Sequence, residues 1–485
     1  MSRLGNQAAV LSIARLANYG LMLVSPMILV RILSVTDFGH YREFLVYTSL
    51  LIAFAGFNVN DSLLYFIPAH TRSKWRIVRQ TVILVACSST AIVALVVALD
   101  WMLKGALIGA YLIPTAIYVL LSVNVDFWEF YWLSEHRSLP VFFYTTGRLL
   151  ARMAVVIAAA VTTHRVITIV WLLIALEGVR LTASTIAWRL RTKGSQQPVP
   201  GLWRDQLKFC MPWGVAVIFA MLSRNLGNIA VVKWLGAAPL AYYTIGLYGE
   251  PIIVAFRNSV SFVLLPEMVR RGAAASDQRL AMWGRGIVVN CILLFPMIVL
   301  LIRYAEPLIV TVFGAAYRPS VVVLQLYALV ILRECFDMTL PLRSANRTSP
   351  LVQSSLVGLL VNAVTLFFLM PIVGIAGGAI GLAAGGFAEV IYLGWCIAAA
   401  SKVALPRLLP WRSIGKVGLA ALSAGCVVWS DVWTRALGFP GVVVASAVYI
   451  ATFGSLLWLF RLPEAELIWD WAMRAARLGA ARPAA

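Results

Sequence analysis

The chain has 485 residues, of which 61% are hydrophobic and only 12% are charged. A soluble protein of this length would expose far too much apolar surface at that composition, which excludes that class. Its formal net charge of +20 would suggest a nucleic-acid partner on a soluble domain, but in a membrane protein cations collect on the cytoplasmic loops. We therefore expect an all-α polytopic membrane protein whose partner is the lipid bilayer and not a nucleic acid.

Apolar stretches of the length needed to cross the hydrocarbon core, roughly 20 residues, recur along the whole chain. The first stretch contains Arg15 and lacks a small-residue cleavage site, so we expect a retained helix and not a signal peptide. In total the sequence predicts about 14 transmembrane helices, at residues 8–33, 41–67, 79–101, 105–132, 141–162, 166–188, 207–234, 239–266, 284–304, 320–341, 348–371, 375–399, 413–433 and 439–460. Cation-rich loops alternate with cation-poor loops along this series, which places both termini in the cytoplasm.

An internal repeat predicts how the helices are grouped. Residues 30–41 read VRILSVTDFGHY, and residues 232–243 read VKWLGAAPLAYY, with a cation, a short turn and a tyrosine at matching places. A hydrophilic stretch with two prolines, residues 189–205, precedes the second copy and has linker chemistry. Six helices precede this stretch and six follow it before the last two, and because six is an even number both halves start on the same side of the membrane and are parallel. The expected division is an N-terminal six-helix bundle (1–190), a cytoplasmic linker (191–206), a C-terminal six-helix bundle (207–400), two additional transmembrane helices (401–460) and a basic amphipathic cytoplasmic tail (461–485).

Motifs for catalysis and for metal or cofactor binding are missing from the sequence. The six cysteines lie in apolar stretches without a CxxC pair, and the four histidines are scattered. There is no Walker A loop, HExxH, GxSxG or Rossmann fingerprint. We therefore expect no metal, no cofactor, no disulfide and no enzyme activity.

Charged residues inside apolar helices each cost about 2.5–3.5 kcal/mol on insertion scales, so each needs a reason. Arg224 and Arg257 have no acidic residue within one turn on their own helices, and we interpret them as lining a cavity that receives an anion. For Arg15 and Arg152 a cavity role and a structural role are equally consistent with the sequence. Together these four arginines form the predicted cationic binding site.

Acidic residues within the helices are candidates for ion coupling, namely Asp61, Glu177 and Asp337. Each also has a structural explanation. Glu177 can pair with Arg180 three residues later, Asp337 can pair with Arg333 four residues earlier, and Asp61 can join helices. The glycines of residues 374–386 have the small-xxx-small spacing of helix contacts, which we assign to close packing inside one chain and not to a dimer.

Four stretches resemble one family of membrane proteins. They are residues 30–41, residues 235–243 (LGAAPLAYY) with 262–266 (FVLLP), residues 306–319 (EPLIVTVFGAAYRP), and residues 371–378 (PIVGIAGG), where Gly378 stands in place of the usual alanine. They are similar to the motifs of the bacterial polysaccharide-export (Wzx-like) flippases of the multidrug/oligosaccharidyl-lipid/polysaccharide (MOP, MATE-like) superfamily, and the resemblance covers residues 1–460.

The resemblance implies a V-shaped, MATE-like pair of six-helix bundles that moves a polyprenyl-pyrophosphate-linked oligosaccharide across the bacterial inner membrane by alternating access. It implies a monomer that works beside other polysaccharide-assembly membrane proteins, and it transfers no catalytic residue. Two alternatives remain. A MATE-type cation-coupled drug exporter would use intramembrane acids, and unpaired arginines outnumber unpaired acids here. A membrane-embedded glycan polymerase or ligase would need a large polar external loop, and the longest predicted loop is residues 304–320.

Overall fold

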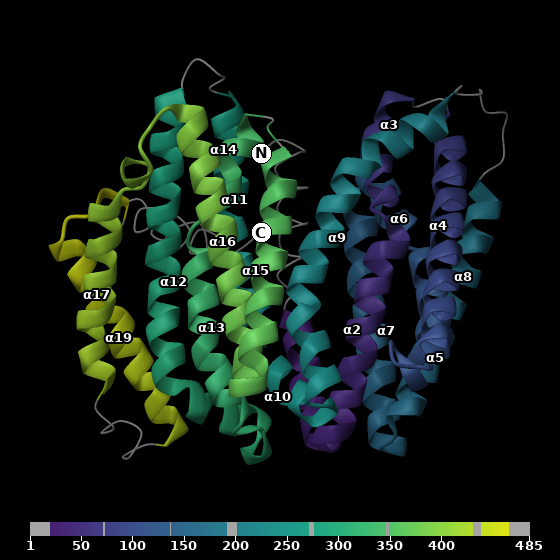
Figure 1. Cartoon of the computed structure of the whole chain (residues 1–485), viewed down its shortest axis with the longest axis horizontal. Helices are drawn as coiled ribbons and strands as arrows, with labels where there is room; N and C mark the ends of the chain where they lie inside the picture. Colours follow the sequence, from purple (N-terminus) through teal and green to yellow (C-terminus); the bar gives the residue numbers. More distant parts are fainter. Residues whose placement is uncertain are drawn as a thin grey trace, which may run out of the picture. The chain divides into compact units, whose positions relative to one another are not determined.

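The computed structural model describes residues 20–464 except 71–72, 136, 192–200, 271–275, 346, 348 and 430–437. Every regular element in this part of the chain is a helix. The chain forms two compact units, Met1–Thr244 and Ile245–Ala485. Each unit is a bundle of long helices, and Figure 1 labels them in chain order.

The first unit starts with a helix over residues Gly20–Ile32. The helices that follow are α2 (Val35–Gly56), α3 (Leu63–Ala69), α4 (Lys74–Met102), α5 (Leu112–Val123), α6 (Phe127–Ser134), α7 (Ser138–Thr163), α8 (Val166–Arg191) and α9 (Leu202–Trp234). Its core contains an aromatic cluster around Phe66, Trp128 and Tyr131, and a second cluster of valines and Ala55 between α2, α4 and α5. Helix α10 (Ala237–Gly246) ends this unit and carries the chain into the next.

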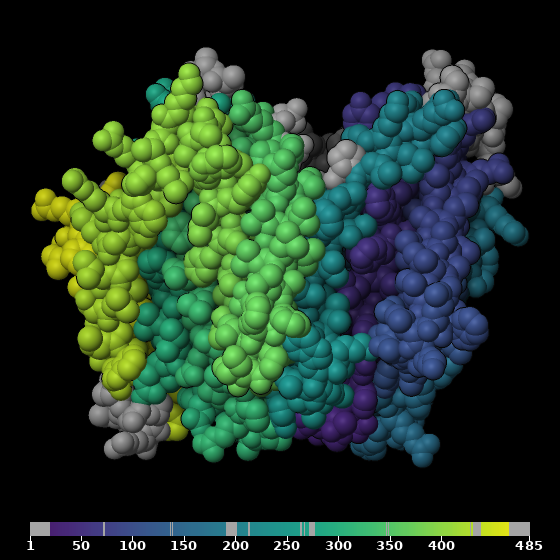
Figure 2. Space-filling view, in the orientation of Figure 1, coloured from purple at the N-terminus to yellow at the C-terminus, as the bar shows by residue number. Residues whose placement is uncertain are grey.

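The second unit contains α11 (Glu250–Arg270), α12 (Ser276–Phe313), α13 (Ser320–Glu334), α14 (Thr339–Ser344), α15 (Ser349–Val373), α16 (Ile375–Ser401), α17 (Trp411–Trp429) and α19 (Phe439–Leu459). Large apolar side chains cover the outer faces of α15 and α16, where Phe367 and Ile391 are each 64% exposed. In the space-filling view these helices form a continuous surface of packed side chains (Figure 2). Such a surface is stable in hydrocarbon and would aggregate in water.

Length and hydropathy identify nine membrane-spanning helices among the described residues, or ten if the bent pair Val35–Gly56 and Val59–Ala69 is one span. These findings confirm the all-helical multi-span class. The expectation of 14 spans goes further than this finding. Several of the predicted ranges contain helices that are broken or short, and the first predicted range is described only from residue 20 onward.

Four of the predicted continuous helices are broken inside the apolar segment. The break between α2 and α3 occurs at Phe57 and Asn58, which both have positive φ angles, and it bends the chain by 44°. The other breaks separate α5 from α6, α10 from α11, and α13 from α14. Non-helical backbone at membrane depth is tolerated only where protein or a polar cavity satisfies it. Polar side chains are therefore expected at these breaks, and the candidate site lies at one of them.

Glycines allow α15 and α16 to pack with their backbones in contact. A Cβ atom on Gly385 would lie 2.6 Å from the carbonyl oxygen of Gly358, and one on Gly377 would lie 2.9 Å from the backbone of Met370. Both distances are shorter than real Cβ contacts. The prediction that this glycine-rich segment packs inside one chain is confirmed.

The two copies of the repeat contact each other within the first unit. Ser34 caps α2 by accepting a hydrogen bond from the Asp37 backbone N–H at 3.1 Å, and Gly236, with φ of 97°, separates α9 from α10. A Cβ on Gly39 would lie only 2.0 Å from the carbonyl oxygen of Ala237, so glycine is required there. Because α9 also packs against α2, the boundary between the compact units follows α9, at Thr244. The predicted division at residues 191–206 describes the sequence repeat and stays a prediction.

Candidate functional site

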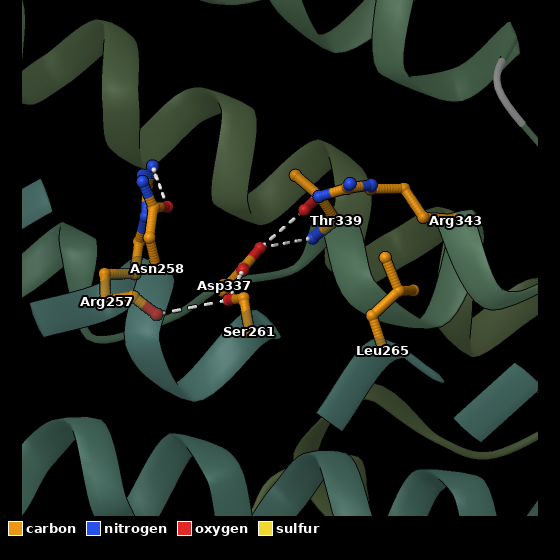
Figure 3. Close-up of a pocket in the computed structure, with 7 residues that line it drawn as sticks. All are labelled: Arg257, Asn258, Ser261, Leu265, Asp337, Thr339 and Arg343. Carbon is orange, nitrogen blue, oxygen red and sulfur yellow. Dashed lines mark hydrogen bonds between the residues drawn. The ribbon is translucent and has the colours of Figure 1, made fainter. Parts of the chain in front are cut away.

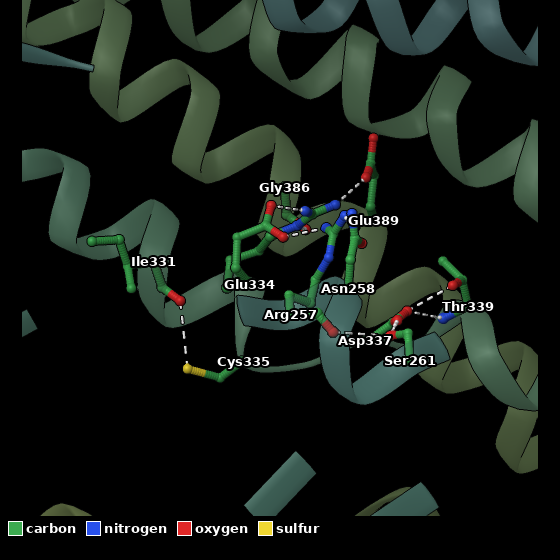
Figure 4. Close-up of polar contacts among 11 residues, drawn as sticks. Arg257, Asn258, Ser261, Ile331, Glu334, Cys335, Asp337, Thr339, Gly386 and Glu389 are labelled. Carbon is green, nitrogen blue, oxygen red and sulfur yellow. Dashed lines mark hydrogen bonds and ion pairs between the residues drawn. The ribbon is translucent and has the colours of Figure 1, made fainter. Parts of the chain in front are cut away.

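A network of partly buried charges joins three helices of the second unit (Figure 4). Arg257 on α11 makes an ion pair with Glu334 at the end of α13, and Arg333 pairs with the same carboxylate. Arg333 also donates to Glu389 on α16 at 2.6 Å. Two guanidinium groups thus face two carboxylates. Because a lone charge at this depth is costly, the network is stable only as a set.

These contacts do not use all of the hydrogen-bond donors of Arg257. One Nη atom pairs with Glu334, and the other donates to the Asn258 side chain at 3.3 Å. Its Nε atom is buried and has no hydrogen-bond partner in the described part of the chain. An unsatisfied buried donor costs about 1–3 kcal/mol, so a group that accepts this hydrogen bond would be stabilised.

A cavity of about 100 Å³ adjoins this arginine, where α11 faces the α13–α14 break. Figure 3 shows Arg257 and Arg343 on opposite sides of Asp337 in this cavity. The Asp337 carboxylate accepts hydrogen bonds from Ser261 at 2.6 Å, from the Thr339 hydroxyl at 2.6 Å and from the Thr339 backbone N–H at 3.0 Å. Because neutral donors hold Asp337, its carboxylate does not use Arg343 or the unpaired Nε of Arg257, and both remain available to an anion.

A second charge network lies in the first unit, at the break between α5 and α6. Asp126 accepts Arg148 of α7 at 2.8 Å and also pairs with Arg180 of α8. Arg180 pairs with Glu177 at 2.5 Å, and its Nε donates to the Tyr144 hydroxyl at 3.0 Å. Each unit therefore has an arginine-carboxylate network beside a broken helix.

The predicted cationic residues that the structure describes lie on different helices of the two units. Arg257 lines the cavity of the second unit, whereas Arg152 lies on α7 within electrostatic range of Tyr118, Tyr41 and Glu177. Arg224 is exposed on α9. Arg15 lies outside the described residues.

The candidate coupling residues have different partners. Asp61 follows the first helix break and accepts the Asn58 amide at 2.6 Å, and Glu177 pairs with Arg180 as the sequence suggested. The alternative pairing of Arg333 with Asp337 is wrong, because Arg333 instead binds Glu334 and Glu389. Among the described residues no three His, Cys, Asp or Glu side chains are placed to hold a metal ion.

Sequence reasoning missed two carboxylates, Asp126 and Glu389. Asp126 interrupts an apolar stretch, and Glu389 follows the glycine-rich segment, so each is a charged residue among apolar neighbours in the sequence. That signal could have identified them. Their presence reduces the surplus of intramembrane arginine over acid from which an anionic cargo was inferred.

Comparison with known proteins decides the family. Residues 28–322 match the profile of a family described as "Polysaccharide biosynthesis protein", which is more than half of the chain. The chain is a member of this polysaccharide biosynthesis family. The resemblance found in the sequence motifs is thereby confirmed. A search of curated protein sequences finds no match.

Two solved structures have a fold similar to that of this polysaccharide biosynthesis family member. It is similar to a lipid II flippase MurJ in an inward closed conformation, with a TM-score of 0.72 and 15% identity over 93% of this chain and 99% of that one. It is also similar to an inward-facing multidrug resistance MATE transporter of the MOP superfamily, with a TM-score of 0.58 and 13% identity over 81% and 99% of the two chains. At these identities the likeness shows the fold alone, which is similar to the helical fold of MurJ and of the MATE transporter.

Proposed function

We propose that this chain moves a polyprenyl-pyrophosphate-linked oligosaccharide from the inner to the outer leaflet of the bacterial cytoplasmic membrane. The product would serve the assembly of O-antigen, capsule or exopolysaccharide. The observation that carries the proposal is Arg257, whose unpaired, buried Nε–H adjoins a small cavity in a polysaccharide biosynthesis family member. The structurally similar MurJ is named as a flippase of lipid II.

The charges around Arg257 suggest how a pyrophosphate would be received. The planar guanidinium donates parallel hydrogen bonds to phosphate oxygens, and Arg343 on α14 adds a second cation at the same cavity. When phosphate replaces Glu334 at Arg257, Glu334 keeps its pair with Arg333. Within the network of Arg257, Arg333, Glu334 and Glu389, no carboxylate then loses its last cation, which lowers the cost of exchanging one anion for another.

Release of Glu334 from Arg257 would loosen the connection between α11 and α13. Binding of the headgroup would thus favour a different arrangement of these helices, which is the differential interaction that alternating access requires. Arg224, Arg152 and Arg15 would guide the headgroup elsewhere on its route. The residues that would bind the coupling ion remain Asp61, Glu177 and Asp337.

The proposal includes an arrangement of the whole chain. In this arrangement the chain has 14 transmembrane helices. Twelve of them form a V-shaped, MATE-like pair of parallel six-helix bundles joined by a cytoplasmic linker, and two further helices precede a cytoplasmic tail. Both termini are cytoplasmic, the protein is a monomer, and it acts beside other polysaccharide-assembly membrane proteins. The charge asymmetry of the loops supports the orientation.

Depletion of the protein followed by lipid analysis tests the function. Cells fed a radiolabelled sugar should accumulate a polyprenyl-linked oligosaccharide that remains inaccessible to an enzyme added outside the cytoplasmic membrane. Re-expression of the wild-type chain should remove the accumulation. If the lipid-linked glycan is unchanged and the cells instead become sensitive to cationic drugs, the protein is an exporter of the MATE type.

A further inference from the structure

A second cavity, of about 210 Å³, lies in the first unit where α6, α7 and α8 meet. Three aromatic rings line it, and we call it the aromatic pocket: Trp128 and Trp132 from α6, and Tyr144 from α7. Its α8 wall contains Arg180, Ala183, Ser184 and Ala187. The charge network described above touches this pocket only through Arg180 and Tyr144.

The aromatic rings form the apolar wall of the pocket. Trp128 and Trp132 are four residues apart and therefore share one face of α6. Their rings stack with centroids 5.3 Å apart and planes 30° apart, and Tyr144 meets Trp132 edge-on at 5.3 Å. These contacts hold the three rings in place, so little side-chain entropy of the protein would be lost when a ligand stacks on them.

Polar groups at the side of the rings have spare hydrogen-bonding capacity. Arg180 has five N–H donors, and its bonds to Tyr144, Glu177 and Asp126 use three of them. Ser184 accepts the Trp128 indole N–H at 2.5 Å, which leaves the hydroxyl hydrogen of Ser184 free to donate. A purely lipid-filled crevice would not need these groups, because every unsatisfied donor in hydrocarbon costs free energy.

The ion pairs that adjoin the aromatic pocket balance. Arg148 and Arg180 pair with Asp126 and Glu177, so the charges of these four ion-paired groups sum to zero. A carboxylate or phosphate ligand would have to separate these pairs. An uncharged ligand with many hydroxyls would not.

Small side chains on α8 provide the space. Ala183 and Ala187 are one turn apart on the helix face that lines the pocket, and Ala183 is exposed, so the pocket opens to the surface of the unit. We propose that the aromatic pocket binds one uncharged pyranose ring, which stacks on Trp132 while its hydroxyls bond Arg180 and Ser184. That this sugar belongs to the transported oligosaccharide rests on the proposed function.

Binding of simple sugars by the purified full-length chain tests the assignment. The protein is held in a sugar-free detergent, and saturation-transfer NMR is recorded with methyl glucoside, methyl galactoside and N-acetylglucosamine as probes. Trp132→Ala removes the stacking surface, and Ala187→Phe fills the pocket without removing any polar group. The matched control for Trp132→Ala is Trp171→Ala, which also removes a tryptophan. Trp171 is 46% exposed and lies on the same helix as Ala187, but it does not line the pocket.

We expect at least one probe to bind the wild-type chain and the Trp171→Ala variant equally, and to bind Trp132→Ala and Ala187→Phe about tenfold to a hundredfold more weakly. The assignment is overturned if no probe binds the wild-type chain, or if both pocket variants bind like wild type. Displacement of the bound sugar by short-chain phosphatidylcholine would also overturn it, because the pocket would then be a lipid crevice. This binding measurement is independent of transport. If depletion of the protein leaves lipid-linked glycans unchanged, the proposed function fails even when sugar binding stands.

Discussion

Arg257 on α11 pairs with Glu334 on α13, 77 positions later in the chain. Glu334 is in turn held by Arg333, which also binds Glu389 on α16. The side chain of Arg257 keeps 24% of its surface exposed, whereas that of Glu334 keeps 11%. The arginine is therefore the member of the pair that an incoming ligand can reach.

Substitution of Arg257 should separate a structural role from a transport role. In Arg257→Ala, Glu334 loses one cation but keeps Arg333, so the free energy of unfolding should fall by about 1–3 kcal/mol. Glycan export should fall at least about tenfold, because the bidentate donor is lost. Export is measured in depleted cells, and stability as the apparent melting temperature of the purified chain.

The double variant Arg257→Ala with Glu334→Gln is the control for that experiment. Removing both charges should recover part of the melting temperature, because no carboxylate is left with reduced pairing and Arg333 keeps its pair with Glu389. Export should remain defective if Arg257 contacts the cargo. Recovery of export together with stability would show that Arg257 acts only in packing.

Arg224 should matter for export without mattering for folding. It is exposed on the apolar helix α9, so Arg224→Ala should leave the melting temperature within about 1 °C while it lowers export several-fold. Arg318→Ala is the matched control, because Arg318 is 72% exposed and pairs with the exposed Glu306. Equal export by Arg224→Ala and Arg318→Ala would remove Arg224 from the cargo route.

Asp126 should be a major electrostatic support of the first unit. Its carboxylate holds Arg148 and Arg180, so Asp126→Asn leaves both cations with weaker partners, and unfolding should become easier by about 3–5 kcal/mol. Thermal unfolding in detergent measures the loss. Glu306→Gln, which weakens an exposed pair, should change the melting temperature little. A similarly small change for Asp126→Asn would contradict the role assigned to it.

A glycine packed between α15 and α16 and a glycine with open space around it on α17 should respond oppositely to substitution by alanine. Gly385→Ala places a Cβ against the Gly358 carbonyl and should destabilise by about 1–3 kcal/mol. Gly415→Ala on α17 has open space around it and should stabilise its helix by about 0.5–1 kcal/mol. Melting temperatures of the two variants should therefore move in opposite directions, and a shared direction would argue against the backbone contact.

Local features of this structure were accessible from the sequence, whereas distant partners were not. Hydropathy predicted helices that overlap those observed, and the spacing of Glu177 and Arg180 predicted their ion pair, because residues three apart share a helix face. The partner of Arg257 lies on another helix, and helical periodicity carries no information about which helix that is.

The helix breaks were also hidden, for a different reason. Apolar residues flank Asp337 in the α13–α14 break and resume after the α2–α3 break, so hydropathy averaged over a window reports one long segment in each case. The breaks depend on backbone angles such as those of Phe57 and Asn58, and on distant side chains that satisfy the freed polar groups. The candidate cavity lies at such a break, so its existence depended on contacts that only the folded chain provides.

Helix α9 has a consequence for how the protein is made. It follows the hydrophilic linker in the sequence, yet it packs against α2 in the first unit, and its Gln206 is fully buried against Thr81 and Ser62 at 2.9 and 3.2 Å. Domains of large proteins generally fold as units, beginning with the N-terminal one as the chain emerges. Here the first unit cannot close its polar interior until the helix after the linker has been synthesised. Until that moment Thr81 and Ser62 have no Gln206 to bond, so a chain synthesised only as far as the linker lacks the buried polar contacts that close the first bundle.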